Sequence, residues 1–196
     1  MVGSVGWNRV LHALVVPGIV LHELAHALTV VLVPGVRITA LDLTSHVSHE
    51  GRYTVTRSFL ISYAPLWVNT GVALLAAYHA AGVDPTNGLE AFLTVCVLCY
   101  LSIVAAFTAF PSFQDAINPV RMLRHRLVSR RSLFVLPVAP ILLVLALPGI
   151  VLAYSFRRLS LARLVCGTLY AAVVVLTGFG VLDPVGYLTE PILEGA

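Results

Sequence analysis

The stretch VLHALVVPGIVLHELAHALTVVLV, from Val10 to Val33, decides the class of this protein. It is apolar over more than the roughly 20 residues that an α-helix needs to cross the hydrocarbon core of a bilayer. It nevertheless contains the carboxylate of Glu23 between the imidazoles of His22 and His26. An Asp at the centre of an inserted helix costs about 2.5 to 3.5 kcal/mol, so ionisable groups at this depth normally face a partner or a cavity. The stretch therefore predicts a membrane span with a functional site inside it.

The composition of the whole chain supports the membrane class. Of 196 residues, 59% are hydrophobic and 11% are charged, and the mean hydropathy is +0.94. Soluble domains are about one quarter charged. The formal net charge is +3, and every basic residue is an arginine. We interpret this charge as a determinant of membrane topology and predict no binding to nucleic acid. The three cysteines lie in apolar stretches and indicate small buried side chains, not a disulfide framework.

The distribution of apolar residues predicts an all-α membrane protein. It should be a single domain, a bundle of about five transmembrane helices. The five stretches long enough to span a bilayer are residues 10–33, 59–81, 89–110, 133–154 and 161–182. A basic segment at 111–132 predicts either an amphipathic helix on the membrane surface or a solvated loop. Residues 183–196 are expected to form a short acidic tail.

Residues 36–57, after the first span, have a different pattern. Apolar and polar residues alternate from Val36 to Leu43 and again from Gly51 to Arg57. A period of two is typical of β-strands with one buried face. We therefore predict a short β-hairpin directly after the first helix.

The arginines also predict an orientation in a cell membrane. With five spans, eight arginines fall on the side of the hairpin and the basic segment, and four fall on the other side. Short cytoplasmic loops collect Arg and Lys. We expect an external N-terminus, with the hairpin, the C-terminus and the site toward the cytoplasmic side.

The sequence His22-Glu23-Leu24-Ala25-His26 is an HExxH motif. Residues four apart lie on the same face of a helix, so His22 and His26 can bind one Zn²⁺ ion while Glu23 acts as general base. The alternative is structural: two histidines hydrogen-bonded between helices beside a protonated Glu23.

A catalytic zinc ion needs about three protein ligands and an open position. The third predicted span should end at the same membrane face as the two histidines, which makes Asp115 the preferred third ligand. Asp42 and Glu50, on the hairpin, are reserve candidates. The sequence SFQD at 112–115 also fits a capping box that opens the basic helix, so Asp115 is expected to be either a ligand or a cap.

This arrangement resembles the site-2 protease family of intramembrane zinc metalloproteases. The sequence APLWVN at 64–69 is similar to the family's GPxxN segment, with Ala64 in place of glycine and one extra residue before the asparagine. FPSFQD at 110–115 takes the place of the family's aspartate motif, with Gln114 and Ala116 in place of leucine and glycine. The resemblance covers residues 10–118. It implies HExxH in a core helix, a membrane-associated β element after it, and an aspartate ligand from a later span.

We predict a zinc metalloendopeptidase that cleaves membrane-protein substrates within or near the bilayer. Zinc held by His22, His26 and Asp115 would polarise the scissile carbonyl and the attacking water, and Glu23 would move the proton. Asn69, inside a span, is a candidate substrate-binding residue, or else forms an interhelical hydrogen bond. An exposed strand of the hairpin is expected to bind an extended substrate.

Two other functions are compatible with the motif. One is a non-catalytic zincin-like membrane scaffold or metal-handling protein. The other is a membrane di-iron oxygenase, which the spacing of His46 and His49 suggests in combination with the first histidine pair. Metal content and the effect of replacing Glu23 distinguish the three.

Overall fold

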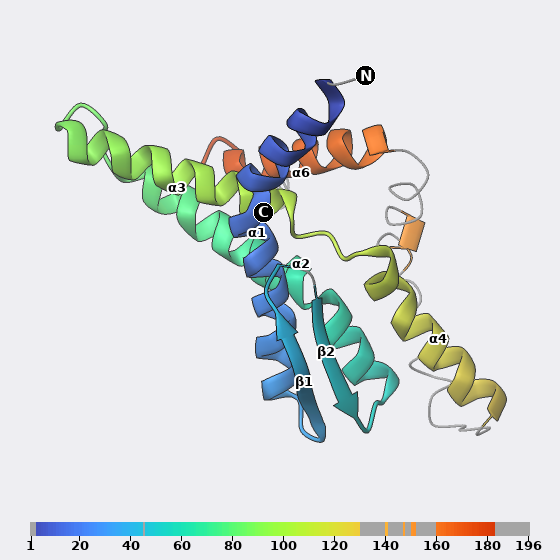
Figure 1. Cartoon of the computed structure of the whole chain (residues 1–196). Coiled ribbons are helices and arrows are strands. Elements are labelled where there is room, and N and C mark those ends of the chain that lie inside the picture. Colours follow the sequence, from blue (N-terminus) through green and yellow to red (C-terminus); the bar gives the residue numbers. More distant parts are fainter. Residues whose placement is uncertain are drawn as a thin grey trace, which may run out of the picture.

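The computed structural model describes residues 3–44, 46–129 and 160–182, together with 140, 147, 150 and 151. In this part of the chain it is mostly helical, with one antiparallel two-stranded sheet after the first helix (Figure 1). The elements are α1 (Gly3–Leu32), β1 (Val36–Asp42), β2 (His46–Gly51), α2 (Val55–Ala81), α3 (Leu89–Phe107), α4 (Phe113–Ser129) and α6 (Ser160–Gly178). The prediction of a helical chain with a hairpin after its first helix is confirmed. The tail, and all of the predicted fourth span except residues 140, 147, 150 and 151, lie outside the described residues.

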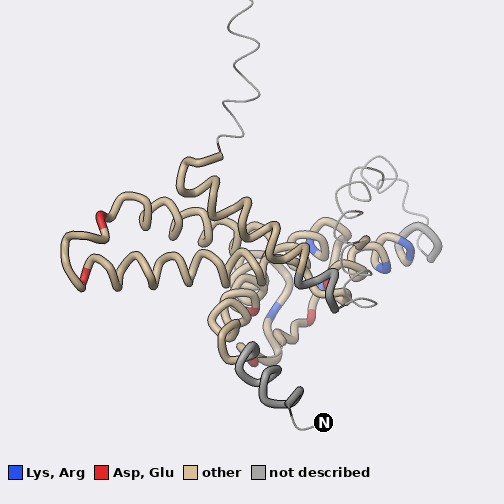
Figure 2. Tube along the Cα trace, turned by 90° about the horizontal axis from the view of Figure 1, so that it is seen from above, with Lys and Arg blue, Asp and Glu red and all other residues tan. Residues whose placement is uncertain are grey.

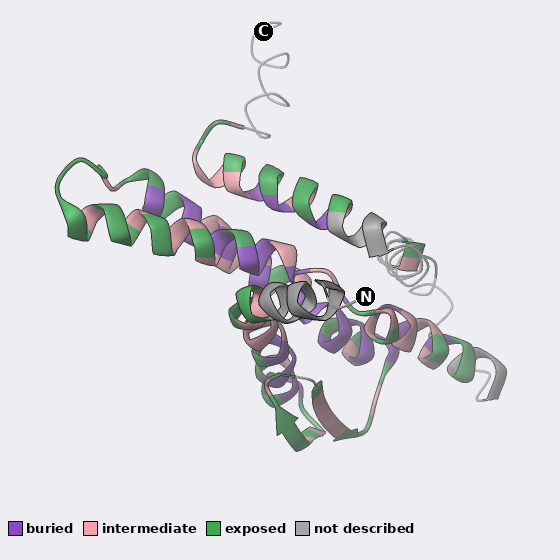
Figure 3. Cartoon of the chain, turned by 45° about the horizontal axis from the view of Figure 1, so that its top comes forward, coloured by how far each residue is buried: buried purple, intermediate pink, exposed green. Residues whose placement is uncertain are grey.

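Within the described residues, three helices are long and apolar enough to cross a membrane. They are α1 over Ala13–Leu32, the whole of α2 and the whole of α3, whereas the apolar part of α6, Val165–Gly178, is shorter. Large apolar side chains stay exposed on these helices, with Val31 at 72% and Trp67 at 61%. Exposed residues also cover much of the α2–α3 pair where it extends away from the other elements (Figure 3). These features suit a lipid environment; the number of crossings and their orientation remain predictions.

The helices pack closely because small residues lie between them. Ala73, Ala105 and Ala106 are buried where α2 and α3 meet, together with Ala171 and Val174 of α6. Side chains of this size let helix backbones approach one another. Charged residues are sparse along the chain, and α3 carries none beyond Glu90 in its first turn (Figure 2).

At Gly18, α1 lies directly against the C-terminal end of α3. A Cβ atom added there would lie 2.5 Å from the carbonyl oxygen of Val104 and 2.6 Å from Oγ1 of Thr108. Backbone and side chain of α3 therefore fill the space that any larger residue would need. Gly18 lies four residues before His22 and so on the same face of α1. This contact brings the HExxH face of α1 against the end of α3.

The two strands of the hairpin pair antiparallel from Val36 opposite Gly51 to Asp42 opposite His46, with a register shift between Ile38 and Ala40. At its turn, the Asp42 carboxylate accepts a hydrogen bond from the Thr44 N–H at 2.9 Å. Apolar side chains of the hairpin pack against a buried cluster that consists of Val30, Val33 and Ile61.

The second strand lies earlier than the alternating pattern at 51–57 predicts. It ends at Gly51, and α2 begins at Val55 instead of at residue 59. Thr54 caps this helix, because its side-chain oxygen accepts a hydrogen bond from the Arg57 N–H at 3.1 Å. Helix capping therefore overrides the strand-like alternation of this segment.

The connection between α3 and α4 occurs where the sequence predicts a break. α3 ends at Phe107, before Pro111, and α4 begins at Phe113. The described part of the basic segment is helical and contains Pro119. Residues 108–112 thus turn the chain from α3 toward the hairpin side, where α4 packs against α2.

Candidate metal centre

Three predicted ligands meet between α1 and α4. One ligand atom each from His22, His26 and Asp115 lie within 4.8 Å of one another. Oδ2 of Asp115 is 3.9 Å from Nε2 of His22 and 3.6 Å from Nε2 of His26. The two imidazole rings are 5.0 Å apart, nearly perpendicular at 75°. This group could hold a metal ion.

Backbone carbonyls orient both histidines. Nδ1 of His22 is 2.8 Å from the Thr108 carbonyl oxygen, and Nδ1 of His26 is 2.8 Å from the Ile61 carbonyl oxygen. A carbonyl only accepts hydrogen bonds, so we assign the proton of each neutral ring to Nδ1. The lone pair then lies on Nε2, the atom that faces Asp115. Both histidines therefore form the hydrogen bonds between elements that the structural alternative predicts. These bonds use Nδ1 and leave Nε2 of each ring for a metal ion, as outer-sphere partners of metal-binding histidines do.

Asp115 is both a helix cap and a member of the group. Its Oδ2 accepts hydrogen bonds from the N–H of Ser112 at 3.0 Å and from the Ser112 hydroxyl, while the Asp115 N–H donates to that hydroxyl oxygen at 3.2 Å. The sequence left cap and ligand as alternatives. The structure shows that one oxygen atom closes the first turn of α4 and faces both histidines.

The carboxyl of Asp115 is an anion at neutral pH. Burial raises its pKa, but in the metal-free site hydrogen bonds from protonated His22 and His26 through Nε2–H, together with the Ser112 hydroxyl, outweigh burial and hold the pKa below its usual range. A metal-binding carboxylate must be deprotonated, so Asp115 meets this requirement.

Glu23 lies beside His22 on α1, and its side chain is buried, with 8% exposed. It is close enough to His26 to interact with it electrostatically. The role of Glu23 as general base stays a prediction.

Asn69, the predicted substrate-binding residue, lies in α2 and is fully buried. Its Nδ2 donates to Thr108, at 3.2 Å from Oγ1 and 3.5 Å from the carbonyl oxygen. Its Oδ1 has no hydrogen-bond partner in the described part of the molecule. Asn69 thus forms an interhelical hydrogen bond behind His22, and its contact with substrate stays a prediction.

The reserve candidates lie outside the group. Asp42 is hydrogen-bonded at the hairpin turn, and Glu50 pairs with Arg37 across the strands. His49 forms a hydrogen bond with the hydroxyl of Tyr53. Asp42, Glu50 and His49 therefore form local contacts and are not part of the group of three ligands.

Sequence reasoning missed the contributions of Thr108 and Ile61. Both act through backbone carbonyls, and no side-chain pattern reveals such a role. Gly18 offered a usable signal, because a glycine four residues before the first motif histidine indicates a close helix contact on that face.

No family model, curated protein or solved structure matches this chain. The resemblance to site-2 proteases rests on the motifs quoted above and remains a prediction.

Proposed function

We propose that this protein is an intramembrane zinc metalloendopeptidase that hydrolyses membrane-protein substrates in or near the bilayer. The observation that carries this proposal is the convergence of His22 Nε2, His26 Nε2 and Asp115 Oδ2 beside Glu23, on a helix apolar enough to cross a membrane. Two imidazoles and one carboxylate form a donor set of catalytic zinc sites, which keep a further position open.

The residues of the site suit peptide hydrolysis. A bound zinc ion would supply Lewis acidity, polarising the scissile carbonyl and making water acidic enough to lose a proton near neutral pH. Glu23 accepts that proton and passes it to the leaving amine nitrogen as the carbon–nitrogen bond breaks and the water oxygen bonds to the carbonyl carbon. The carbonyls of Thr108 and Ile61 keep the two imidazoles oriented throughout.

Because the site lies on a helix apolar enough to cross a membrane, we expect a substrate that is itself in the membrane. A helical substrate must unwind locally before its carbonyl can react, because its backbone groups are bonded to each other. The hairpin supports this step in our proposal, since most residues of β1 are exposed and a strand edge can bind an extended peptide.

The test compares purified full-length wild-type protein with Glu23→Gln. The variant should keep one zinc ion per chain, while cleavage falls by at least about 100-fold, the usual contribution of a general base. Candidate substrates come from comparing the proteomes of membranes that contain each form. Glu90→Gln, an exposed carboxylate in the first turn of α3, is the matched control and should cleave normally.

Each rival predicts a different result. Iron in place of zinc favours the oxygenase. Zinc without cleavage by the wild-type protein favours a metal-handling scaffold, and cleavage that is unchanged in Glu23→Gln would defeat the proposed peptidase mechanism.

A further inference from the structure

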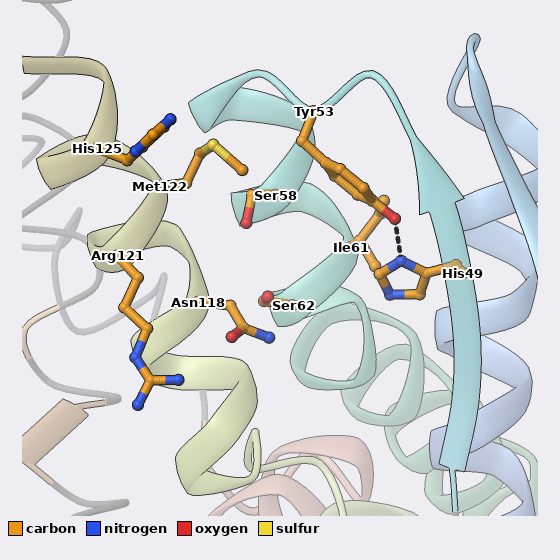
Figure 4. A pocket seen from close by; sticks show the side chains of 9 residues that line it. All are labelled: His49, Tyr53, Ser58, Ile61, Ser62, Asn118, Arg121, Met122 and His125. Carbon is orange, nitrogen blue, oxygen red and sulfur yellow. Dashed lines mark hydrogen bonds between the residues drawn. The ribbon is translucent and has the colours of Figure 1, made fainter. Parts of the chain in front are cut away.

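A cavity of about 370 Å³ lies between β2, α2 and α4 (Figure 4). Two of the elements that line this cavity, α2 and α4, also contribute to the metal centre. Ile61, which lines the cavity, holds His26 through its backbone carbonyl. Asn118, also in its wall, follows Asp115 by three residues on α4. A group bound here would therefore lie close to the candidate ligands.

The charged side chain in the lining of this cavity is a cation, Arg121. Two of the other eight lining residues are His49 and His125, and none of the nine is acidic. Arg121 is exposed and has no ion-pair partner within the described ranges. Asp115, on the same helix, is occupied by the two motif histidines and Ser112. The cavity thus offers positive charge without a carboxylate in its walls.

Neutral donors complete the polar lining. Asn118 accepts a hydrogen bond from Gln114 Nε2 at 3.1 Å through its Oδ1, which leaves its own N–H groups to donate. The hydroxyls of Ser58 and Ser62 belong to buried residues of α2. In Figure 4 the Asn118 and Met122 side chains of α4 extend toward those of α2, and the guanidinium of Arg121 lies below them. Donors therefore surround this space on more than one side.

The spacing on α4 explains why these groups share one face. Positions 118, 121, 122 and 125 are separated by three or four residues and line up along a helix. Met122 adds an apolar surface between the polar groups, which suits the methylene part of a side chain. The guanidinium of Arg121 offers paired N–H groups that match a carboxylate.

We propose that this cavity is a subsite for an acidic side chain, Glu or Asp, of the peptide substrate near its scissile bond. This subsite rests on the proposed peptidase function, and it defines a class of substrate for the same site. The carboxylate would bind Arg121 at the α4 wall, with Asn118 and the serine hydroxyls as further donors.

The test measures peptide binding, so that it does not depend on cleavage. Full-length zinc-loaded Glu23→Gln protein in lipid nanodiscs is titrated with matched pairs of amidated peptides. Each pair has Glu or Gln at one position, and this position is moved along the peptide. Amidation removes the terminal carboxylate as a competing anion. At one position the Glu peptide should bind about tenfold more tightly, as expected for a charge-assisted hydrogen bond.

Arg121→Gln should abolish this preference. Arg124→Gln removes the same charge from an exposed residue of α4 that does not line the cavity, and it should retain the preference. Arg121→Glu should instead favour a peptide with Lys at that position. A reversal of this kind also shows that the variant is folded.

The outcomes separate the two proposals. Equal binding of every Glu and Gln pair, or equal loss in Arg121→Gln and Arg124→Gln, overturns the subsite, even if the wild-type protein cleaves peptides. A preference that depends on Arg121 supports the subsite, and if the wild-type protein then lacks cleavage, only the peptidase proposal fails. Binding of anionic lipid headgroups that Arg121→Gln removes, without any peptide preference, also overturns it.

Discussion

His22 and Asn69 share one hydrogen-bond acceptor, the backbone carbonyl oxygen of Thr108. His22 Nδ1 lies 2.8 Å from this oxygen and Asn69 Nδ2 lies 3.5 Å from it. The three residues come from α1, α2 and the C-terminal end of α3, so the first metal-binding histidine is oriented where three helices meet.

This relationship predicts that Asn69→Leu lowers zinc affinity. The change replaces Asn with an apolar side chain of similar size and removes the amide that holds Thr108. Loss of an outer-sphere partner typically costs 10- to 100-fold in metal affinity, and we expect about tenfold because Asn69 acts through Thr108. Competition with a chromophoric chelator measures the change. Asn87→Leu, in the exposed turn before α3, is the control. A raised KM with unchanged zinc affinity would instead support the predicted contact of Asn69 with substrate.

Asp115→Asn should abolish tight zinc binding. Asn keeps an oxygen that can accept the Ser112 hydrogen bonds, so α4 keeps its cap while the site loses its negative charge. We expect a loss of more than about 100-fold in zinc affinity, beyond the effect typical of outer-sphere partners. Metal analysis after dialysis gives the stoichiometry. Asp42→Asn, at the hairpin turn, should keep one zinc ion per chain; full zinc content in Asp115→Asn would remove Asp115 from the ligand set.

The parts of the site that local pattern specifies were predictable. His22 and His26 share a helix face because of their spacing alone, and Asp115 followed from the scarcity of carboxylates and the expected membrane face. The same reasoning predicted the hairpin from alternating residues, although its second strand lies earlier than predicted, at His46–Gly51, and Thr54 begins a helix instead.

The support of the site was not predictable. The acceptor for His22 lies 86 residues away along the chain, and this pairing depends on how α1 packs on α3. Backbone carbonyls carry no sequence signature, so neither Thr108 nor Ile61 could be singled out. The cavity likewise arises only when α4 packs against α2 near His49 of β2.

His49 should titrate below its usual range. Burial lowers its pKa and the nearby charge of His26 acts in the same direction, against a smaller opposing effect of Asp115. The unfolded chain therefore binds more protons than the folded chain between the folded pKa and about 6.5, so stability falls as the pH drops through this window. NMR of histidine-labelled protein, with the signal assigned by His49→Gln, measures the pKa directly. The variant should also show a weaker pH dependence of its melting temperature below pH 6.5, whereas His79→Gln should not. A His49 pKa at or above 6.5 contradicts the prediction.

Gly18→Ala should separate α1 from α3 and weaken the site without touching any ligand. The added Cβ would overlap the Val104 carbonyl oxygen and the Thr108 side chain, at 2.5 and 2.6 Å. Because Gly18 precedes His22 by one helical turn, the displacement should lengthen the hydrogen bond from His22 to Thr108. Overpacking of this kind costs about 1 to 3 kcal/mol, so we expect a lower melting temperature together with weaker zinc binding. Gly71→Ala is the matched control, because a Cβ there meets nothing within 4 Å and alanine is the better helix former. Equal melting temperatures and zinc affinities for the two variants would show that the contact at Gly18 does not position the HExxH face.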